Sequence, residues 1–251
     1  MTEILQNITL DLFLGGKLRI FQPSSGYRSG IDPVLLAASL PVKEGERVLE
    51  LGCGVGVASL CLMQRVGGVN VSAIELKPYL ADLARRNGRE NNFSLEVFSG
   101  DISNMPHDLT AQSFDHVMAN PPYFDRSRGS RSEDHDREHA RGEYTPLSVW
   151  VDTAARRVKP KGYVHFIFPT ERLADLLAVL PNHVGSVQVT PLVPRQGRGS
   201  DLMILQARHS GRAPFKLLPQ IVLHQAEEHT KDGDDYTAHL SRVLRDGQGL
   251  F

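Results

Sequence analysis

From Arg47 onward the chain alternates short apolar runs with helix-like segments, and this alternation constrains its fold more than any other feature. Runs rich in Val, Ile, Leu and Phe predict buried strands. Strands that are joined through helices by short connections form a mostly parallel sheet with helices on both faces. We predict strands at 47–51, 70–76, 94–101, 113–122, 162–168, 184–193 and 201–209, and helices at 57–66, 78–91, 146–158 and 170–180.

The expected fold is therefore α/β, with a doubly wound, Rossmann-like sheet. The last two strands are joined only by the short loop Pro-Arg-Gln-Gly-Arg-Gly-Ser, which predicts one antiparallel strand near the end of the sheet. A helix is also expected at 32–41, with Asp32 as its cap and Pro33 in its first turn. We divide the chain into an N-terminal cover segment (1–45), a main domain (46–210) and a C-terminal extension (211–251).

A glycine motif follows the first strand of the main domain, with Gly52, Gly54 and Gly56 at alternate positions. Glycine lets the backbone turn sharply and approach a ligand closely, and the next helix presents free N–H groups. Dinucleotide-binding proteins use G-x-G-x-x-G, but here the third glycine comes one residue earlier. Glu50 suits a ligand with an ammonium group, such as the methionine end of S-adenosylmethionine. A tight turn without a ligand is the alternative.

Two more acids follow the next strands. Glu75 ends the second strand, where a carboxylate can accept both hydroxyls of a ribose. Asp101 follows the third strand and can accept from an adenine amino group. Each acid alone is equally a solvated strand end, but three at successive strand ends predict a cofactor site. The expected cofactor is S-adenosylmethionine, bound by Glu50, Gly52, Gly54, Gly56, Glu75 and Asp101.

The fourth strand ends in Asn120-Pro121-Pro122-Tyr123-Phe124, and here the sequence resembles the amino-group methyltransferases. Their mark at this place is Asn or Asp, two prolines and an aromatic residue. The lone pair of an adenine amino group is delocalised into the ring, so hydrogen-bond acceptors on its N–H groups would favour a more nucleophilic nitrogen. The Asn120 side chain and the Pro121 carbonyl can supply them, and Tyr123 offers a stacking face. The alternative is that the prolines only end the strand and that the aromatic residue only fills space in the packing.

The N-terminal segment contains five further short elements: Gly15-Gly16, Gln22-Pro23, Gly26-Tyr27-Arg28, Gly30-Ile31-Asp32 and Leu35-Leu36. With these elements the sequence resembles, more narrowly, the bacterial tRNA (adenine-N6)-methyltransferases that act beside the anticodon of a valine tRNA. This resemblance covers roughly residues 9–210. It implies that the segment lies over the cofactor and that Arg28 and Asp32 line the methionine end, although a local ion pair or a helix cap suits both residues equally well.

Three other functions stay open. The Asn-Pro-Pro-Tyr tetrapeptide also occurs in glutamine methyltransferases that modify release factors, but only 46 residues precede the first strand, which leaves little room for their helical domain. DNA adenine methyltransferases carry it too, and no separate target-recognition domain is evident in 251 residues. A non-catalytic RNA-binding factor need not keep Asn120 to Tyr123 intact.

Charge gives mixed evidence on an RNA partner. The net charge is −1, whereas nucleic-acid binders are usually basic. Residues 195–212 hold four arginines against one acid, whereas 225–235 is acidic. The 125–143 loop has five arginines and four acids within 126–141, which fits an RNA-contacting loop or a self-neutralising solvated loop. His135 and His139 lie four apart, but without a third ligand cluster we expect no metal.

The remaining features predict a cytoplasmic protein. No run of about 18 apolar residues occurs, so no membrane span is expected. The N-terminus lacks the basic leader and apolar run of a secretory signal. Cys53 and Cys61 form no disulfide framework, which fits a reducing compartment.

Overall fold

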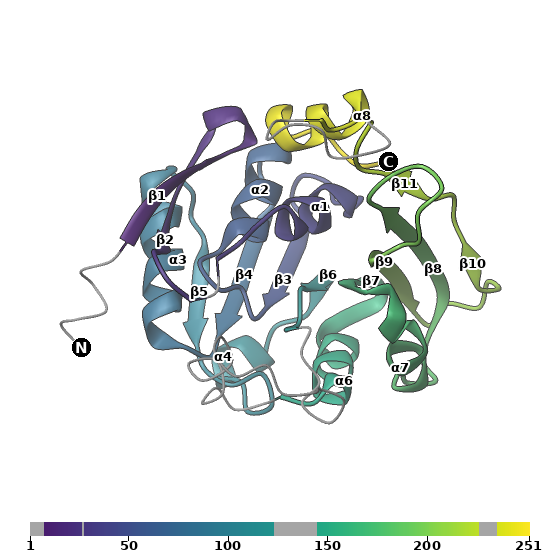
Figure 1. The fold of residues 1–251 in the computed structure, drawn as a ribbon. Helices are drawn as coiled ribbons and strands as arrows, with labels where there is room; N and C mark the ends of the chain where they lie inside the picture. Colours follow the sequence, from purple (N-terminus) through teal and green to yellow (C-terminus); the bar gives the residue numbers. More distant parts are fainter. Residues whose placement is uncertain (1–7, 27, 123–144, 226–234) are drawn as a thin grey trace, which may run out of the picture.

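A computed structural model describes residues 8–26, 28–122, 145–225 and 235–251 (Figure 1). Within these ranges the chain forms a nine-stranded sheet and a separate two-stranded hairpin at the N-terminus. None of the helices in the described ranges has the length and apolar character needed to cross a bilayer.

The large sheet is doubly wound, as predicted. Its order is β10-β8-β9-β7-β6-β3-β4-β5, and β11 also pairs with β8. The chain runs outward from β3 to β5 on one side and from β6 to β7 on the other, so the order reverses between β3 and β6. The antiparallel strand is β9, which lies between β7 and β8. The bounds are β3 (Arg47–Leu51), β4 (Asn70–Glu75), β5 (Glu96–Ser99), β6 (Phe114–Ala119), β7 (Val158–Pro169), β8 (Val184–Val193), β9 (Leu202–His209), β10 (Lys216–Leu217) and β11 (Ile221–Val222).

Helices cover both faces of the sheet, because side chains alternate between the faces along each strand. On β6, Met118 packs in the same core as α1 and α2, whereas Val117 packs on the opposite face with α6. Ile167 and Phe166 on β7 divide in the same way. The helices are α1 (Asp32–Ser39), α2 (Val57–Arg65), α3 (Pro78–Glu90), α4 (His107–Thr110), α6 (Leu147–Arg157), α7 (Leu173–Ala178) and α8 (Ala238–Ser241).

The N-terminal hairpin pairs β1 (Ile8–Phe13) with β2 (Leu18–Pro23). A short 3-10 turn, η2 (Leu14–Gly16), joins the strands, and its two glycines take positive φ values of 65° and 92°. Leu18 and Ile20 are fully buried in the core that also contains α1 and α2. Figure 1 shows β2 beside α3. An isolated two-stranded hairpin is at best marginally stable, so this packing holds it in place.

Some predicted details were wrong. Ile31, and not Asp32, occupies the N-cap of α1, so Asp32 lies in the first turn, where its charge suits the helix dipole. The expected helix at 170–180 is a 3-10 turn, η3 (Thr170–Arg172), followed by the short α7. β7 begins at Val158, so it follows α6 directly. Near the C-terminus, the π-helical turn η4 (Arg242–Asp246) packs against α1 and η2.

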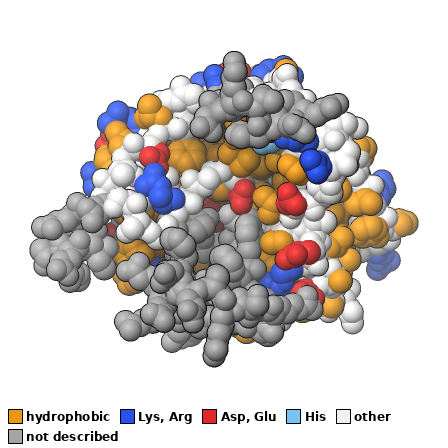
Figure 2. All heavy atoms as spheres, in the orientation of Figure 1, with side chains coloured by type: hydrophobic (Ala, Val, Ile, Leu, Met, Phe, Trp, Pro, Cys, Tyr) orange, Lys and Arg blue, Asp and Glu red, His pale blue; other side chains and the backbone are white. Residues whose placement is uncertain are grey.

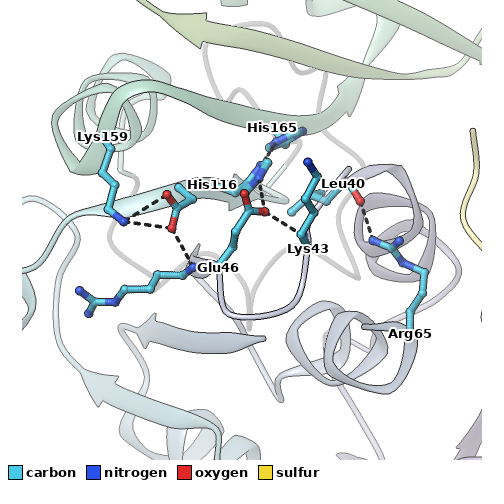
Figure 3. A network of polar contacts seen from close by, with 9 residues as sticks. Leu40, Lys43, Glu46, Arg65, His116, Lys159 and His165 are labelled. Atoms are coloured by element: carbon cyan, nitrogen blue, oxygen red, sulfur yellow. Dashed lines mark hydrogen bonds and ion pairs between the residues drawn. The ribbon is translucent and has the colours of Figure 1, made fainter. Parts of the chain in front are cut away.

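Two buried histidines, His116 and His165, form a chain of polar contacts with Glu46 (Figure 3). His116 on β6 and His165 on β7 contact each other through Nδ1 and Nε2, 3.0 Å apart. On the other side of its ring, His116 Nε2 lies 3.3 Å from the Glu46 carboxylate. His165 Nδ1 is buried and has no hydrogen-bond partner in the described part of the chain. Burial lowers the pKa of His116 and, more strongly, the pKa of His165.

Candidate active site

Four parallel strands end side by side at one edge of the sheet, and the structure brings four predicted site residues to this edge. Neighbouring strands end almost level, because Leu51 of β3 pairs with both Ala119 of β6 and Ile74 of β4. Glu50 is the second-last residue of β3 and Glu75 is the last residue of β4. Asn120 and Asp101 follow the ends of β6 and β5. Open α/β sheets bind ligands at this edge, and especially where the strand order reverses.

The Glu75 carboxylate accepts hydrogen bonds from backbone N–H groups and so fixes the glycine turn. Its Oε2 accepts a hydrogen bond from the Gly54 N–H at 2.9 Å, and its Oε1 accepts one from the Lys77 N–H at 2.9 Å. The side chain is buried. A carboxylate has about four acceptor positions, so these two bonds leave capacity for a ligand's hydroxyl groups. Glu75 therefore fixes the turn and can also receive a sugar.

Glu50 is buried directly behind the same turn. Its Oε2 accepts hydrogen bonds from the Ser59 N–H at 3.0 Å and from the Ser59 hydroxyl. Burial raises the pKa of Glu50 to about 7, and the charge of Glu75 adds to this rise, whereas the two hydrogen bonds from Ser59 oppose it. A cationic group beside the carboxylate would favour the ionised form. Binding of an ammonium group beside Glu50 would therefore stabilise its ionised form, which burial disfavours.

The three glycines of the turn have different surroundings, although all take positive φ values of 65°, 55° and 86°. A Cβ on Gly52 would lie 2.4 Å from Cη2 of Trp150, which is on α6. A Cβ on Gly56 would lie 3.3 Å from the Cβ of Ala84 on α3. Among the described residues, a Cβ on Gly54 would meet no atom within 4 Å. Described protein atoms therefore close two sides of the turn, and they leave the side at Gly54 open.

These surroundings predict unequal effects of alanine in the turn. Gly52→Ala adds a clash with an indole to the backbone strain, so it should lower the free energy of unfolding by about 3 kcal/mol or more. Gly54→Ala adds backbone strain alone and should cost about 1–2 kcal/mol. Urea unfolding of both variants measures the difference. Adding Trp150→Leu should recover part of the loss in Gly52→Ala, and equal losses in the two single variants would contradict the packing.

Asp101 and the cover segment are held by local contacts. Asp101 Oδ1 accepts from the Ser103 N–H at 2.7 Å, which fixes the turn after β5. Arg28 pairs with Asp11 of β1 at 2.5 Å and donates to the Thr9 hydroxyl and the Pro23 carbonyl. The local ion pair that the sequence left open for Arg28 is thus present. Its polar contacts lie within the hairpin segment.

The Asn-Pro-Pro motif leaves β6 at the centre of the edge. Asn120 is half-buried, Pro121 is buried and Pro122 is exposed. Tyr123 and the 125–143 loop, including His135 and His139, lie outside the described residues. In the described ranges, no group of three His, Cys, Asp or Glu side chains is arranged to hold a metal ion.

Sequence reasoning missed two residues of this site. Ser59 holds Glu50, and Trp150 packs against Gly52. Ser59 had a visible signal, since it is a polar residue within the apolar start of α2. Trp150 had none, because its contact joins segments about a hundred residues apart.

The molecular surface shows how charge is distributed around these elements. On the face seen in Figure 2, acidic side chains lie close together near the middle, next to a band of hydrophobic side chains. Among the described residues on this face, Lys and Arg side chains are scattered rather than gathered in one field. This distribution agrees with the nearly neutral net charge of the chain.

Comparisons with known proteins agree with this geometry. Residues 29–134 match the model of the methyltransferase small domain. The tRNA1(Val) (adenine(37)-N6)-methyltransferase of Haemophilus influenzae (strain Rd) is 34% identical over 236 residues, which are 92% of this chain and 95% of that protein. The enzyme of the same name from Porphyromonas gingivalis is 34% identical over 66% of this chain and 68% of its own length.

Solved structures share the fold. A predicted O-methyltransferase from Agrobacterium tumefaciens superposes with a TM-score of 0.71 at 22% identity, over 88% of this chain and 98% of that one. The T. thermophilus 16S rRNA N2 G1207 methyltransferase, solved with AdoMet and guanosine, has a TM-score of 0.56 at 19% identity, over 81% of this chain and 50% of that one. At these identities the likeness concerns the fold alone.

Proposed function

The chain belongs to the tRNA1(Val) (adenine(37)-N6)-methyltransferase family, and we propose that it transfers a methyl group from S-adenosylmethionine to the N6 amino group of an adenine beside the anticodon of a tRNA. The observation that carries this proposal is the position of Asn120 and Pro121 at the end of β6. They lie next to the strand that holds Glu50 and the glycine turn. A target amino group and a methyl donor can therefore meet at one edge of the sheet.

The residues at this edge fit the cofactor. S-adenosylmethionine, when bound, supplies a methyl group on a positively charged sulfur. In our proposal Glu50 receives its ammonium group, Glu75 accepts from the ribose hydroxyls, and Asp101 accepts from the adenine amino group. The turn at Gly52, Gly54 and Gly56 admits the cofactor on its open side, because no atom of the described part of the chain lies within 4 Å of a Cβ placed at Gly54. The segment from Arg28 to Asp32 covers the methionine end.

The target base is handled by the Asn-Pro-Pro-Tyr motif. The Asn120 side-chain oxygen and the Pro121 carbonyl would accept hydrogen bonds from the two amino hydrogens and hold the amino nitrogen toward the methyl donor. Alignment of this kind supplies much of the rate of a group transfer between bound molecules. After transfer the methylated nitrogen would lose its extra proton to water, and S-adenosylhomocysteine would leave. Pro122 restricts the backbone beside the acceptors, and Tyr123 stacks on the base. The base must leave its stacked position to enter.

The partner is then a tRNA, and the enzyme works in the cytoplasm. Cys53 and Cys61 are both free and buried, which suits a reducing compartment.

Isothermal titration calorimetry with S-adenosylmethionine tests the cofactor half of this proposal. We expect one molecule bound per chain. A folded chain that binds neither S-adenosylmethionine nor S-adenosylhomocysteine would overturn it.

A further inference from the structure

The outer edge of β2 is paired by side chains instead of by a strand. In the described residues β2 has only β1 as a strand neighbour. Two asparagines of the α3 region take the place of a second one. Asn87 Oδ1 accepts from the Phe21 N–H at 2.8 Å, and its Nδ2 donates to the Phe21 carbonyl at 3.1 Å. Asn91 makes the same pair of bonds with Arg19, at 2.9 and 2.8 Å.

The spacing of the two asparagines explains why this pairing works. Residues i and i+4 of a helix are about 6 Å apart along its axis. Residues i and i+2 of a strand are about 6.7 Å apart, and both point their backbone groups to the same edge. Asn87 and Asn91 therefore meet Phe21 and Arg19 in register, with the helix antiparallel to the strand. Their amides bind the strand as another strand would.

Asn87 alone extends this pairing to the glycine turn. Its Nδ2 also donates to the Val55 carbonyl at 2.9 Å, and Val55 lies between Gly54 and Gly56. The Asn87 side chain is fully buried, with an exposed fraction of 0%. The second bond of Asn91 Nδ2 goes instead to the Asn87 carbonyl within its own helix. One buried amide thus joins the hairpin, α3 and the turn.

The turn is held from two sides. Glu75 accepts from the Gly54 N–H, and Asn87 donates to the carbonyl of the following residue, Val55. A turn with three glycines has many other accessible conformations, so a flexible turn would lose entropy when it closes on a ligand. Without Asn87, the Val55 carbonyl would also lose its buried donor. Both effects would weaken ligand binding at the turn.

We propose that Asn87 is a positioning residue that sets the affinity for the cofactor and couples the glycine turn to the N-terminal hairpin. This inference rests on the proposed function, since it takes the turn as the S-adenosylmethionine site. The coupling is reciprocal: if the docked hairpin tightens cofactor binding, the bound cofactor holds the hairpin more firmly. Residues 28–32, which follow the hairpin within the cover segment, are then placed at the same time as the turn.

The matched pair Asn87→Ala and Asn91→Ala tests the proposal. Each variant loses two hydrogen bonds to β2, but only the first loses the bond to the turn. By calorimetry, Asn87→Ala should raise the Kd for S-adenosylhomocysteine about tenfold, and Asn91→Ala should change it by less than about twofold. With saturating cofactor, Asn87→Ala should keep kcat near the wild-type value, so that the loss falls on KM. Equal Kd values in the two variants would overturn the proposal.

Hydrogen exchange of the wild-type chain tests the coupling even if Asn87→Ala does not fold. S-adenosylhomocysteine should slow exchange of the Phe21 amide about tenfold. Unchanged exchange in a chain that binds the ligand would overturn the coupling. A wild-type chain that binds no ligand would instead overturn the proposed function, and the asparagine pairing would then serve hairpin docking alone.

Discussion

Replacing Asn120 by alanine is expected to lower methyl transfer to tRNA by about 10²- to 10³-fold or more, while the Kd for S-adenosylmethionine stays within about twofold. The side chain follows β6 directly and is half-buried at the edge where the strands that hold Glu50 and Glu75 end. In the proposed reaction it orients the amino group instead of holding the cofactor. Loss of one well-placed polar group that acts in the transition state has effects of this size.

Asn120→Asp is the matched variant, because it keeps an acceptor oxygen at the same position. We expect it to retain more activity than Asn120→Ala in single-turnover assays with saturating cofactor. If the alanine variant transfers methyl groups at a near-normal rate, the assigned role of Asn120 is wrong. If it loses cofactor affinity in parallel with activity, the residue supports the cofactor site and not the target.

Acid is expected to destabilise the fold through the buried histidines His116 and His165. Each of the two contacts needs one donor and one acceptor. His116 therefore donates its Nε2–H to Glu46, and His165 donates its Nε2–H to His116 Nδ1. Both rings are then neutral, and His165 Nδ1 remains an acceptor in the core. Protonation of His165 would place a charge in an apolar setting beside His116, which is why its pKa is well below 6.5.

The direction of the pH effect follows from this lowered pKa. Below about pH 6.5 the unfolded chain binds a proton on His165 that the folded chain does not bind, so stability falls as the pH falls. Between pH 7.5 and 5.5 His165 alone should remove about 1 kcal/mol from the free energy of unfolding. His116 adds to this loss, because its pKa is also lowered, although Glu46 and Asp115 partly oppose the shift.

Glu50 has the opposite effect, since its pKa is raised to about 7 in the folded chain and acid favours the fold there. A comparison between variants therefore isolates the histidines. Urea unfolding at pH 7.5 and 5.5 should show that acid lowers the free energy of unfolding less in His165→Leu than in wild type, by about 1 kcal/mol. His107→Leu, at an exposed ring on α4, is the control. An unchanged acid loss in His165→Leu would contradict the prediction.

The fold was most predictable where local sequence and tertiary packing favour the same structure. The strand at 184–193 and the one at 47–51 have the predicted bounds, because Val and Leu make up half or more of each segment and favour strands. The hairpin at 8–23 was not predicted as strands. Its partner along one edge is a pair of asparagines on a helix, and no local pattern in 8–23 reveals that partner. The two-residue strands β10 and β11 are too short to give a pattern.

The candidate site shows the same limit. Spacing placed Glu50, Glu75 and Asp101 at strand ends, since a carboxyl-terminal edge can be predicted from strand order alone. The partners that hold these residues could not be predicted in this way. Trp150 reaches Gly52 from α6, and Asn87 reaches Val55 from α3, because the helices pack on opposite faces of the sheet. Such contacts depend on the packed structure and not on spacing along the chain.

The identity of the methylated product decides whether the proposed reaction is right. The most direct measurement is transfer of labelled methyl from S-adenosylmethionine to tRNA that lacks the modification, followed by nucleoside analysis and mapping. We expect label in N6-methyladenosine at one position beside the anticodon, and a rate of labelling lower by about a hundredfold or more after Asn120→Ala. Label in protein glutamine, in rRNA or in another nucleoside, from a chain that binds the cofactor, would contradict the proposed reaction.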